Sequence, residues 1–202
     1  NTAEGTVNTS SLTFTPGNWN VPQTVTITGV NDFVADGNTS YTINVGPCSS
    51  ANSNYQGLVP SSVSVTNNDN DTAGYNVVSG TLMVTDAGQL SSSFTIQLTS
   101  QPVQPVTVPM VSSMPTEATV SPSSIVFTSS NWNVAQTVTV SGVSDGISDG
   151  NKAFTIDFQS AVTTDTAYNG LGMPGSINAG SCDNDYGGVS IITACNASPN
   201  QN

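Results

Sequence analysis

The sequence contains no histidine, and Lys152 is its only basic residue. A Ser-His nucleophile relay and a zinc site with histidine ligands are therefore excluded. The sequence contains 13 acidic residues and one Lys, so its formal net charge is -12. Nucleic acids and anionic membrane surfaces recruit Lys and Arg, so the composition argues against both as partners. We expect no enzyme activity from this chain.

Long apolar runs and helix formers are also scarce. No run approaches the roughly 20 apolar residues of a membrane helix, and no signal peptide opens the chain. Thr, Ser, Asn, Val and Gly are abundant instead, and β-branched residues favour strands. The composition predicts an all-β protein. Its low content of charged residues and its many Ser and Thr residues suit an extracellular surface protein, at the cell surface or secreted.

The chain contains an internal repeat. The segment NWNVPQTVTITGVNDFVADGN begins at Asn18, and NWNVAQTVTVSGVSDGISDGN begins 113 residues later, at Asn131. The match continues from NYQGL to AYNGL and, after a one-residue insertion, from NNDND at Asn67 to SCDND at Ser181. A match of this extent indicates one structural unit that is used twice.

Apolar and polar residues alternate inside each copy. Val25 and Ile27 alternate with Thr residues in the first copy, and so do Val138 and Val140 in the second. This period of two is typical of a strand with one buried and one exposed face. Further strands are predicted at residues 41–45, 62–66, 75–85, 92–99, 105–112 and 152–158. Short strands at this spacing indicate an antiparallel β-sandwich.

The second copy contains SPSSIVFTSSNWNVAQTVTVSGVSDGISDGNKAFTI, followed by AYNGL and CDND. This sequence resembles the Calx-beta domain, and it is most similar to the tandem Calx-beta domains of bacterial surface proteins. The resemblance covers almost the whole chain. It implies tandem immunoglobulin-like sandwiches of seven strands, with calcium at the end of each domain. One acid position of the family falls on Asp86. Asn31-Asp32 and Ser144-Asp145 each keep only one acid of a family pair, and the terminal acidic triplet is thinned in both copies, which implies fewer or weaker calcium sites.

The repeat divides the chain into three parts. Residues 72–185 hold a complete sandwich, whereas residues 1–71 start at the position of Met114 and lack equivalents of residues 73–113. Residues 186–202 match the first strand of a further repeat, with Val189, Ile191 and Ile192 as an assembly strand. Two interpretations are open: the chain is an excerpt of a longer array, or subunits join head to tail by strand addition. Residues 187–202 supply only 16 of the 41 missing positions, so the second interpretation needs more partner surface.

Eleven of the 13 acids, Glu4 among them, fall in matched loops of the two copies. Two carboxylates about 5 Å apart repel by roughly 3 kcal/mol at an effective dielectric constant near 20. With one Lys in the chain, a bound cation or water has to relieve this repulsion, and calcium prefers such oxygen ligands. The alternative is that these are solvated loop acids that keep the sandwich soluble. The candidate calcium ligands are Asp32, Asp36, Asp69, Asp71, Asp86, Glu117, Asp145, Asp149, Asp183 and Asp185, with Asn31, Asn68, Asn70 and Asn184 as neutral oxygen donors.

The chain has three cysteines, Cys48, Cys182 and Cys195. The segment GGVSIITA separates the last two, and as one straight strand it would span about 26 Å. That span is too long for a disulfide between them. The odd number of cysteines indicates a bond between chains or a free thiol. Our hypothesis for such a bond is that Cys182 or Cys195 reaches a Cys48 across a junction to another subunit or a following domain.

Aromatic residues and sequons also repeat or recur. Trp19 and Trp132 are expected to cover the edge of the core, with sugar stacking as the alternative. Tyr55 and Tyr168 are expected to anchor the loop before the last strand, as in a tyrosine corner. Four Asn-x-Ser/Thr sequons are candidate glycosylation sites: Asn8, Asn38, Asn70 and Asn196.

These features predict a non-enzymatic extracellular structural protein. It would be a subunit or segment of a head-to-tail surface filament or adhesin stalk, with junctions stabilised by calcium or by hydrogen bonds. The competing hypothesis is a ligand- or carbohydrate-binding module of a larger secreted adhesin or enzyme. Exposed aromatic residues gathered in one cleft would favour that hypothesis.

Overall fold

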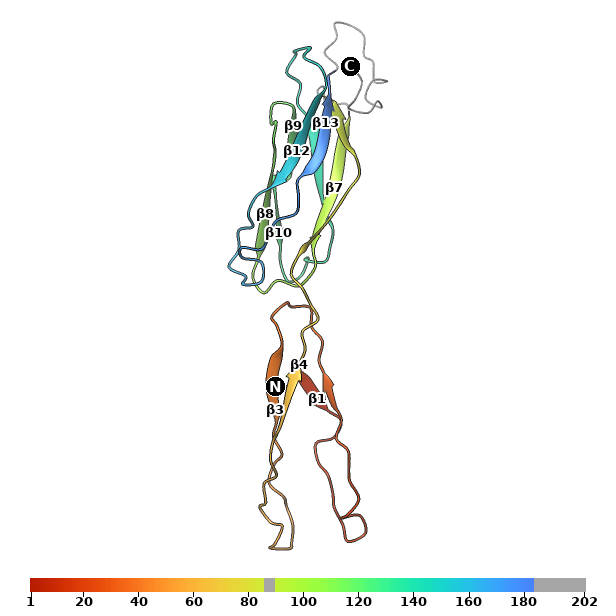
Figure 1. Cartoon of the computed structure of the whole chain (residues 1–202), viewed down its shortest axis with the longest axis vertical. Helices are drawn as coiled ribbons and strands as arrows, with labels where there is room; N and C mark the ends of the chain where they lie inside the picture. Colours follow the sequence, from red (N-terminus) through yellow and green to blue (C-terminus); the bar gives the residue numbers. More distant parts are fainter. Residues whose placement is uncertain (86–89, 184–202) are drawn as a thin grey trace. The chain divides into compact units, whose positions relative to one another are not determined.

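The computed structural model describes residues 1–85 and 90–183 (Figure 1). The chain divides into two compact units, which we call unit 1 (Asn1–Asp71) and unit 2 (Thr72–Asn202). All regular elements of the described residues are strands, so the predicted all-β class is confirmed. The described part of the chain holds no helix with the length and apolar character needed to cross a membrane.

Unit 2 is a sandwich of two sheets. One sheet has the strand order β10-β8-β12-β13-β6, and the other has the order β5-β7-β11-β9. Neighbouring strands are antiparallel, except for β13 and β6, which run parallel. The strands are β5 (Tyr75–Ser79), β6 (Leu82–Thr85), β7 (Ser91–Leu98), β8 (Val106–Ser112), β9 (Ala118–Ser121), β10 (Ser124–Phe127), β11 (Gln136–Gly142), β12 (Lys152–Phe158) and β13 (Ile177–Cys182).

The alternating residues of unit 2 fill one continuous core between its sheets. Phe94 and Ile96 of β7 are buried, as are Val106 and Val108 of β8. The strand predicted at residues 75–85 is two strands, because the chain crosses at Gly80 from one sheet to the other. The described residues of unit 2 therefore form nine strands, instead of the seven that the family resemblance implied.

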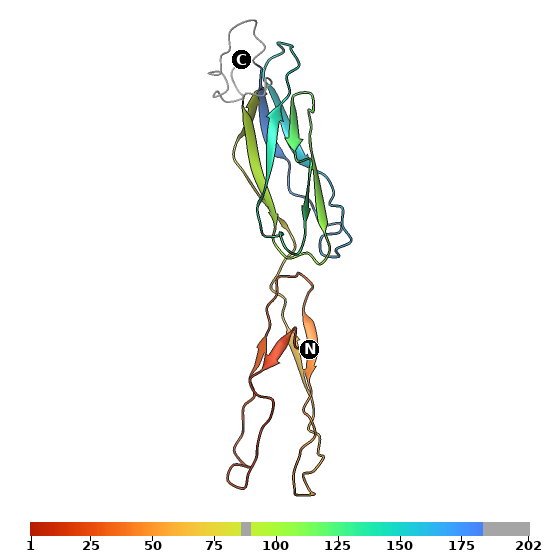
Figure 2. The same cartoon turned by 180° about the vertical axis from the view of Figure 1, so that it is seen from behind.

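Unit 1 contains two separate two-stranded ribbons. β1 (Gly5–Val7) pairs with β2 (Ile27–Gly29), and β3 (Thr39–Ile43) pairs with β4 (Val63–Asn67), both antiparallel. These strands occupy the repeat positions of β9, β11, β12 and β13 of unit 2. In both views the two ribbons diverge toward the loops at residues 8–26 and 44–62 (Figures 1 and 2).

Unit 1 forms fewer and shorter strands than the equivalent part of unit 2, and the strand predicted at residues 24–29 is confirmed only in part. The alternation at residues 24–29 gives a strand only at its last three residues, and residues 11–14 form no strand although their equivalents in unit 2 are β10. In unit 2, β11 lies between β7 and β9, and β12 lies between β8 and β13. Unit 1 offers no equivalents of β7 and β8, so strands that need two neighbours form only in part.

One glycine brings the two ribbons of unit 1 together. Gly5 of β1 lies against the ring of Tyr41 of β3, and a Cβ atom at Gly5 would overlap the Tyr41 hydroxyl group. Tyr41 is the one large apolar side chain that is buried in unit 1. The equivalent pair in unit 2 is Ala118 and Phe154, both buried. The tyrosine hydroxyl thus takes the space that the alanine methyl group fills in the other copy.

Candidate metal centre

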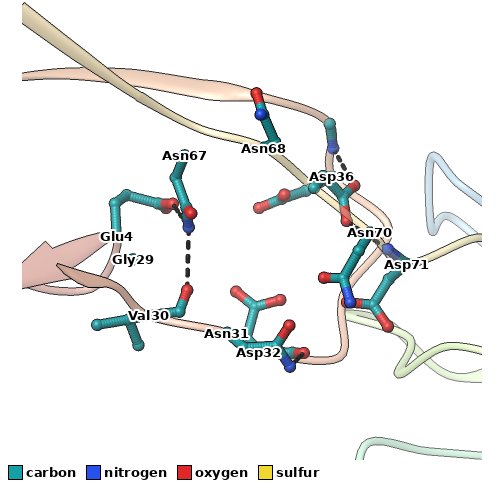
Figure 3. Close-up of a pocket in the computed structure, with 12 residues that line it drawn as sticks. Glu4, Gly29, Val30, Asn31, Asp32, Asp36, Asn67, Asn68, Asn70 and Asp71 are labelled. Atoms are coloured by element: carbon teal, nitrogen blue, oxygen red, sulfur yellow. Dashed lines mark hydrogen bonds between the residues drawn. The ribbon is translucent and has the colours of Figure 1, made fainter.

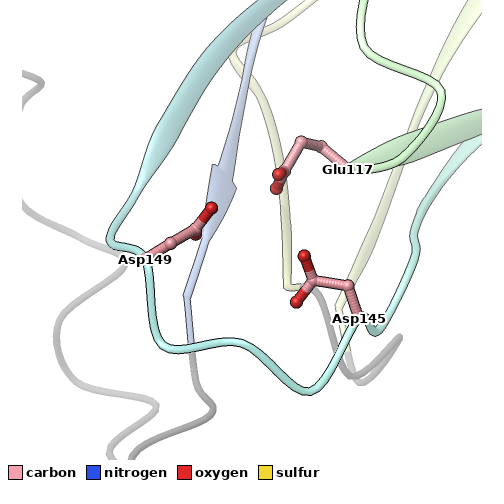
Figure 4. A group of neighbouring side chains, drawn as sticks. All are labelled: Glu117, Asp145 and Asp149. Carbon is pink, nitrogen blue, oxygen red and sulfur yellow. The ribbon is translucent and has the colours of Figure 1, made fainter.

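Unit 2 brings together three acids that the sequence analysis proposed as metal ligands. Glu117 precedes β9, whereas Asp145 and Asp149 lie in the loop between β11 and β12. One carboxylate oxygen from each of the three lies within 4.8 Å of the others (Figure 4). Glu117 is buried and the two aspartates are exposed. The group therefore combines a fixed carboxylate at the sheet end with two carboxylates on a loop.

Unit 1 has acids at the equivalent positions, but of the described residues only Glu117, Asp145 and Asp149 form so close a group. Glu4, Asp32 and Asp36 line a pocket of ≈ 230 Å³, together with Asp69 and Asp71 from the end of β4 (Figure 3). The same pocket is lined by the amide side chains of Asn31, Asn67, Asn68 and Asn70. All polar side chains of this pocket end in oxygen or amide groups, the ligand types that calcium prefers.

Backbone hydrogen bonds hold the acidic loops in the same way in both units. The amide of Val30 donates to the carbonyl of Glu4 at 2.9 Å, and the amide of Val143 donates to the carbonyl of Glu117 at the same distance. The Asp32 carboxylate accepts a hydrogen bond from the amide two residues later at 2.9 Å, and the Asp145 carboxylate does so at 2.8 Å. The loop shape is thus encoded locally.

Asp69 and Asp183, which follow the last strand of each copy, close the acidic loop onto the end of that strand. Asp69 Oδ2 accepts a hydrogen bond from the Gly37 amide at 2.7 Å, and Asp183 Oδ2 accepts one from the Gly150 amide at 2.7 Å. Both glycines have positive φ angles, 85° and 82°, which favour glycine at this turn. Asp69 also accepts a hydrogen bond from the Asp71 amide at 2.7 Å. One oxygen of Asp183 is therefore bound to the loop.

The pKa values of two acids in the unit 1 pocket are shifted in opposite directions. Desolvation, followed by the negative charges of Asp32, Asp69 and Glu4, raises the pKa of Asp36 above its usual value. Hydrogen bonds from the amides of Asp71 and Gly37 lower the pKa of Asp69. Asp69 is thus a stabilised anion, whereas the charge on Asp36 is unfavourable until a cation compensates it.

The two units differ in their counterions. In unit 2, Lys152 Nζ lies 3.1 Å from Asp149 Oδ2, an ion pair three residues apart on partly exposed side chains. Such exposed pairs contribute little to stability. Thr39 takes the place of Lys152 in unit 1, which contains no Lys or Arg at all. The acids of the unit 1 pocket therefore have no basic side chain of their own unit to offset their charge.

Most of the predicted calcium ligands lie in the described part of the chain. One acid of the unit 1 pocket, Glu4, was not among the predicted ligands. Asp86, Asp185 and Asn184 lie outside the described residues. Glu4 was noted as a loop acid but not as a ligand, although its repeat partner Glu117 was. The offset of 113 residues was the signal that would have included it. Asn67, whose amide donates to Glu4 Oε2 at 3.1 Å and to the Val30 carbonyl at 2.9 Å, had no such signal.

The repeated aromatic residues behave differently in the two units. Tyr168 is fully buried, and its hydroxyl donates to the Ser100 carbonyl at 2.7 Å, so the predicted anchoring role is confirmed there. Tyr55 is 59% exposed, and the same prediction is wrong for it, because unit 1 has no counterpart of the Ser100 loop. Trp132 packs against the core of unit 2, whereas Trp19 is exposed.

The cysteine prediction needs a correction. Cys182 is disulfide-bonded, so it is not available to Cys48 of a neighbouring subunit. Cys48 is a free and exposed cysteine, and Cys195 lies outside the described residues. The disulfide removes the basis for an intersubunit bond at Cys182.

The sequons and the assembly strand are placed as follows. Asn8 Oδ1 accepts a hydrogen bond from the Thr26 amide at 2.9 Å, and Asn38 Oδ1 accepts one from the Asp69 amide at 2.9 Å. Both side chains and Asn70 are exposed. Asn151, the counterpart of Asn38, makes the same bond to Asp183 at 3.1 Å without a sequon, so this position has a structural role. Asn196, Val189, Ile191 and Ile192 lie outside the described residues.

The fold and the acidic loops define an all-β protein whose complete unit is a two-sheet sandwich with clustered carboxylates at one end. No family model matches the chain, and no curated protein matches it. The solved structure of WR4, an MSP family member of C. elegans, is similar at a TM-score of 0.34 and 13% identity, over 54% of this chain and 96% of that one. Domains 4 and 5 of the S-layer protein SbsC are similar at a TM-score of 0.33 and 19% identity, over 77% and 81% of the two chains. Neither similarity is close enough to support an argument about function.

Proposed function

We propose that the protein is an extracellular structural protein, made of Calx-beta-like sandwiches, that associates head to tail in a surface filament or stalk. One observation carries the proposal: the same repeat positions are buried in unit 2 and exposed in unit 1. Phe127 is fully buried and Phe14 is 56% exposed, and the Tyr168–Tyr55 pair behaves alike. Unit 1 therefore exposes apolar side chains at positions that the complete copy buries.

Unpaired strand edges support the same proposal. In unit 1, β2 pairs only with β1, and β3 pairs only with β4. Free edges of this kind accept strands from other chains through main-chain hydrogen bonds. The segment with Val189, Ile191 and Ile192 would contribute one such strand in a head-to-tail contact. A contact of this type that does not close into a ring produces a filament.

The disulfide supports an extracellular location. Disulfides such as that of Cys182 persist in oxidising compartments and are rare in the cytosol. The low content of charged residues, 7%, and the many Ser and Thr residues agree with this assignment.

Calcium fits the acidic loops chemically. The donor set is made of carboxylate and amide oxygens, and three carboxylates approach one another in unit 2 with a single Lys nearby. Glu117, Asp145 and Asp149 would hold the ion in unit 2, and Glu4, Asp32 and Asp36 would hold it in unit 1. A bound cation would cancel their mutual repulsion and stiffen the loops that follow β2 and β11.

Electron microscopy of the native material with and without a calcium chelator tests this function. We expect long uniform fibres that lose order when calcium is removed. Monodisperse particles under all conditions would rule out assembly. Fibres that are indifferent to the chelator would remove calcium from the proposal and leave the assembly intact.

A carbohydrate-binding module is the second candidate, and the exposed ring of Trp19 is the observation that favours it. Aromatic rings of this kind can stack on sugars. Titration of a glycan panel against the full chain and Trp19→Ala would separate the two candidates. Saturable binding that Trp19→Ala abolishes would favour the binding module.

Attached glycans at Asn8, Asn38 and Asn70 would appear by mass spectrometry of native material.

A further inference from the structure

Unit 1 is open where β8 runs through unit 2. β8 pairs with β10 along its first half, with Phe127 opposite Val106 and Ile125 opposite Val108. Along its second half it pairs with β12, where Phe158 lies opposite Met110. One strand of seven residues therefore joins two segments that are not otherwise paired with each other.

The hydrogen bonds of β8 reach beyond its regular ladder on both sides. The Met110 amide donates to the Ser123 carbonyl at 2.8 Å, on the β10 side. On the β12 side, the amide of Gln159 donates to the Pro109 carbonyl at 2.9 Å, and the Ser113 amide donates to the Thr155 carbonyl at 2.9 Å. The strand is thus held by backbone bonds along both edges.

The counterparts of these flanking segments in unit 1 are residues 11–14 and 43–45. Leu12 is 41% exposed, and its equivalent Ile125 is 6% exposed. Phe14 is 56% exposed, and its equivalent Phe127 is fully buried. Val45 is also exposed. Residues 11–14 form no strand, although their equivalents are β10. In unit 2 the equivalents of Leu12 and Phe14 lie opposite Val108 and Val106 of β8.

Two other edges of unit 1 are also free, but each would satisfy only one neighbour. A strand of the β7 type would pair with β2, and a strand of the β6 type would pair with β4. A strand of the β8 type makes backbone hydrogen bonds on both sides in unit 2, and in unit 1 it would lie beside Leu12 and Phe14. This lane between residues 11–14 and 43–45 is therefore the most favourable place for one added strand.

We infer that this lane, which we call the β8 lane, accepts a β-strand of the β8 type from a further copy of this repeat. The inference rests on the proposed function and names the contact that would build the assembly. The occupant has apolar side chains at three alternate positions, as Val106, Val108 and Met110 have in β8. It is uncharged, because residues 104–113 and the lane residues 10–14 and 42–46 contain no charged side chain.

The control for this inference lies in the chain itself. Val21 is 53% exposed in unit 1, and its repeat partner Val134 is 53% exposed in unit 2. Its exposure therefore does not depend on β8. A charge at Val21 alters an exposed apolar position as Phe14→Asp does, but outside the β8 lane.

A peptide with the sequence of residues 104–113 and blocked ends tests the lane when it is added to the full chain. We expect hydrogen exchange to slow by at least about tenfold at residues 10–14 and 42–46. A matched peptide with Val106→Ser, Val108→Ser and Met110→Ser should give no protection. Phe14→Asp should weaken binding of the first peptide by about 100-fold, while Val21→Asp should change it less than about threefold.

The outcomes separate the lane from the wider assembly. Equal protection by both peptides, or equal affinity for Phe14→Asp and Val21→Asp, would overturn the β8 lane. Fibres whose growth the first peptide does not inhibit would also overturn it, while the proposed assembly would stand. Binding in the lane without any fibres would keep the acceptor lane and contradict the head-to-tail assembly.

Discussion

At the residue scale, the two copies of the repeat act as natural variants of each other. Gly5 and Tyr41 in unit 1 replace Ala118 and Phe154 in unit 2. The two exchanges compensate, because one removes a methyl group where the other adds a hydroxyl group. Either change alone would alter the space at the contact between the two ribbons of unit 1.

Gly5→Ala should therefore destabilise unit 1 by about 1–3 kcal/mol, because the new methyl group overlaps the Tyr41 hydroxyl group. The double variant Gly5→Ala with Tyr41→Phe recreates the pair of unit 2 and should recover most of this loss. Urea denaturation of the three proteins, followed at unit 1, measures both effects. A double variant no more stable than Gly5→Ala would contradict the compensation.

The acids of the unit 1 pocket predict a pH dependence that calcium reverses. The raised pKa of Asp36 means that the folded unit favours the protonated form. Without calcium, the unfavourable contribution of Asp36 is fully present above its folded pKa and disappears as the pH falls through it toward 3.8. Asp69 acts in the opposite sense, but only as the pH falls below 3.8, because its pKa is lowered.

Unit 1 without calcium should accordingly become more stable, relative to Asp36→Asn, as the pH falls from 7 toward 4. With saturating calcium the sign should invert, because protonation of Asp36 then competes with the ion. Melting temperatures of both proteins across this range, with calcium or with chelator, provide the measurement. The same slope in both conditions would show that Asp36 takes no part in cation binding.

At the scale of strands, the repeat shows how far alternation alone can predict structure. The pattern at residues 137–142 predicted β11, and the closely similar pattern at residues 24–29 gave only the short β2. The local sequence is nearly the same in the two copies. The difference is the neighbouring β7, which supplies the ladder on one side of β11 and has no counterpart in unit 1. Strand formation depends on its partner, which no local pattern reports.

The candidate site was more predictable than the strand ends. The acids of each copy recur at fixed offsets, so the repeat alone grouped Asp32 with Asp36 and Asp145 with Asp149. The role of Asn67 could not be foreseen, because it depends on the packing of β4 against the loop after β2. The division of residues 75–85 into β5 and β6 could not be predicted either, because it depends on the two strands belonging to different sheets.

The pair Val138 and Val25 tests the importance of the partner strand directly. Val138 of β11 is fully buried, whereas its counterpart Val25 is 37% exposed. Val138→Ala should destabilise unit 2 by about 2 kcal/mol through lost burial and a cavity. Val25→Ala should change the stability of unit 1 by about 0.5 kcal/mol or less. Denaturation curves for each variant give both values, and similar losses would mean that Val25 is covered in solution.

At the scale of the whole molecule, the two units contain the same repeated sequence, but unit 1 lacks a hydrophobic core like that of unit 2. Among the described residues, seventeen buried side chains form the core of unit 2, from Leu82 to Ile177, and none of them belongs to unit 1. Hydrophobic burial is the main favourable contribution to folding, and small domains with little burial are marginal. The repeat therefore predicts similar shapes, while the packing predicts very different stabilities.

This difference should appear as two unfolding transitions in one chain. Trp19 is the only Trp of unit 1 and Trp132 is the only Trp of unit 2, so Trp132→Phe and Trp19→Phe leave one fluorescent reporter for each unit. In urea, the Trp19 signal should change at a lower midpoint than the Trp132 signal, with a smaller slope because unit 1 exposes less buried surface on unfolding.

Adding the peptide of residues 104–113 should raise the midpoint of Trp19 and leave that of Trp132 unchanged, because ligands stabilise only the unit that binds them. Coincident midpoints without peptide would show that unit 1 already has its full complement of partners in this chain.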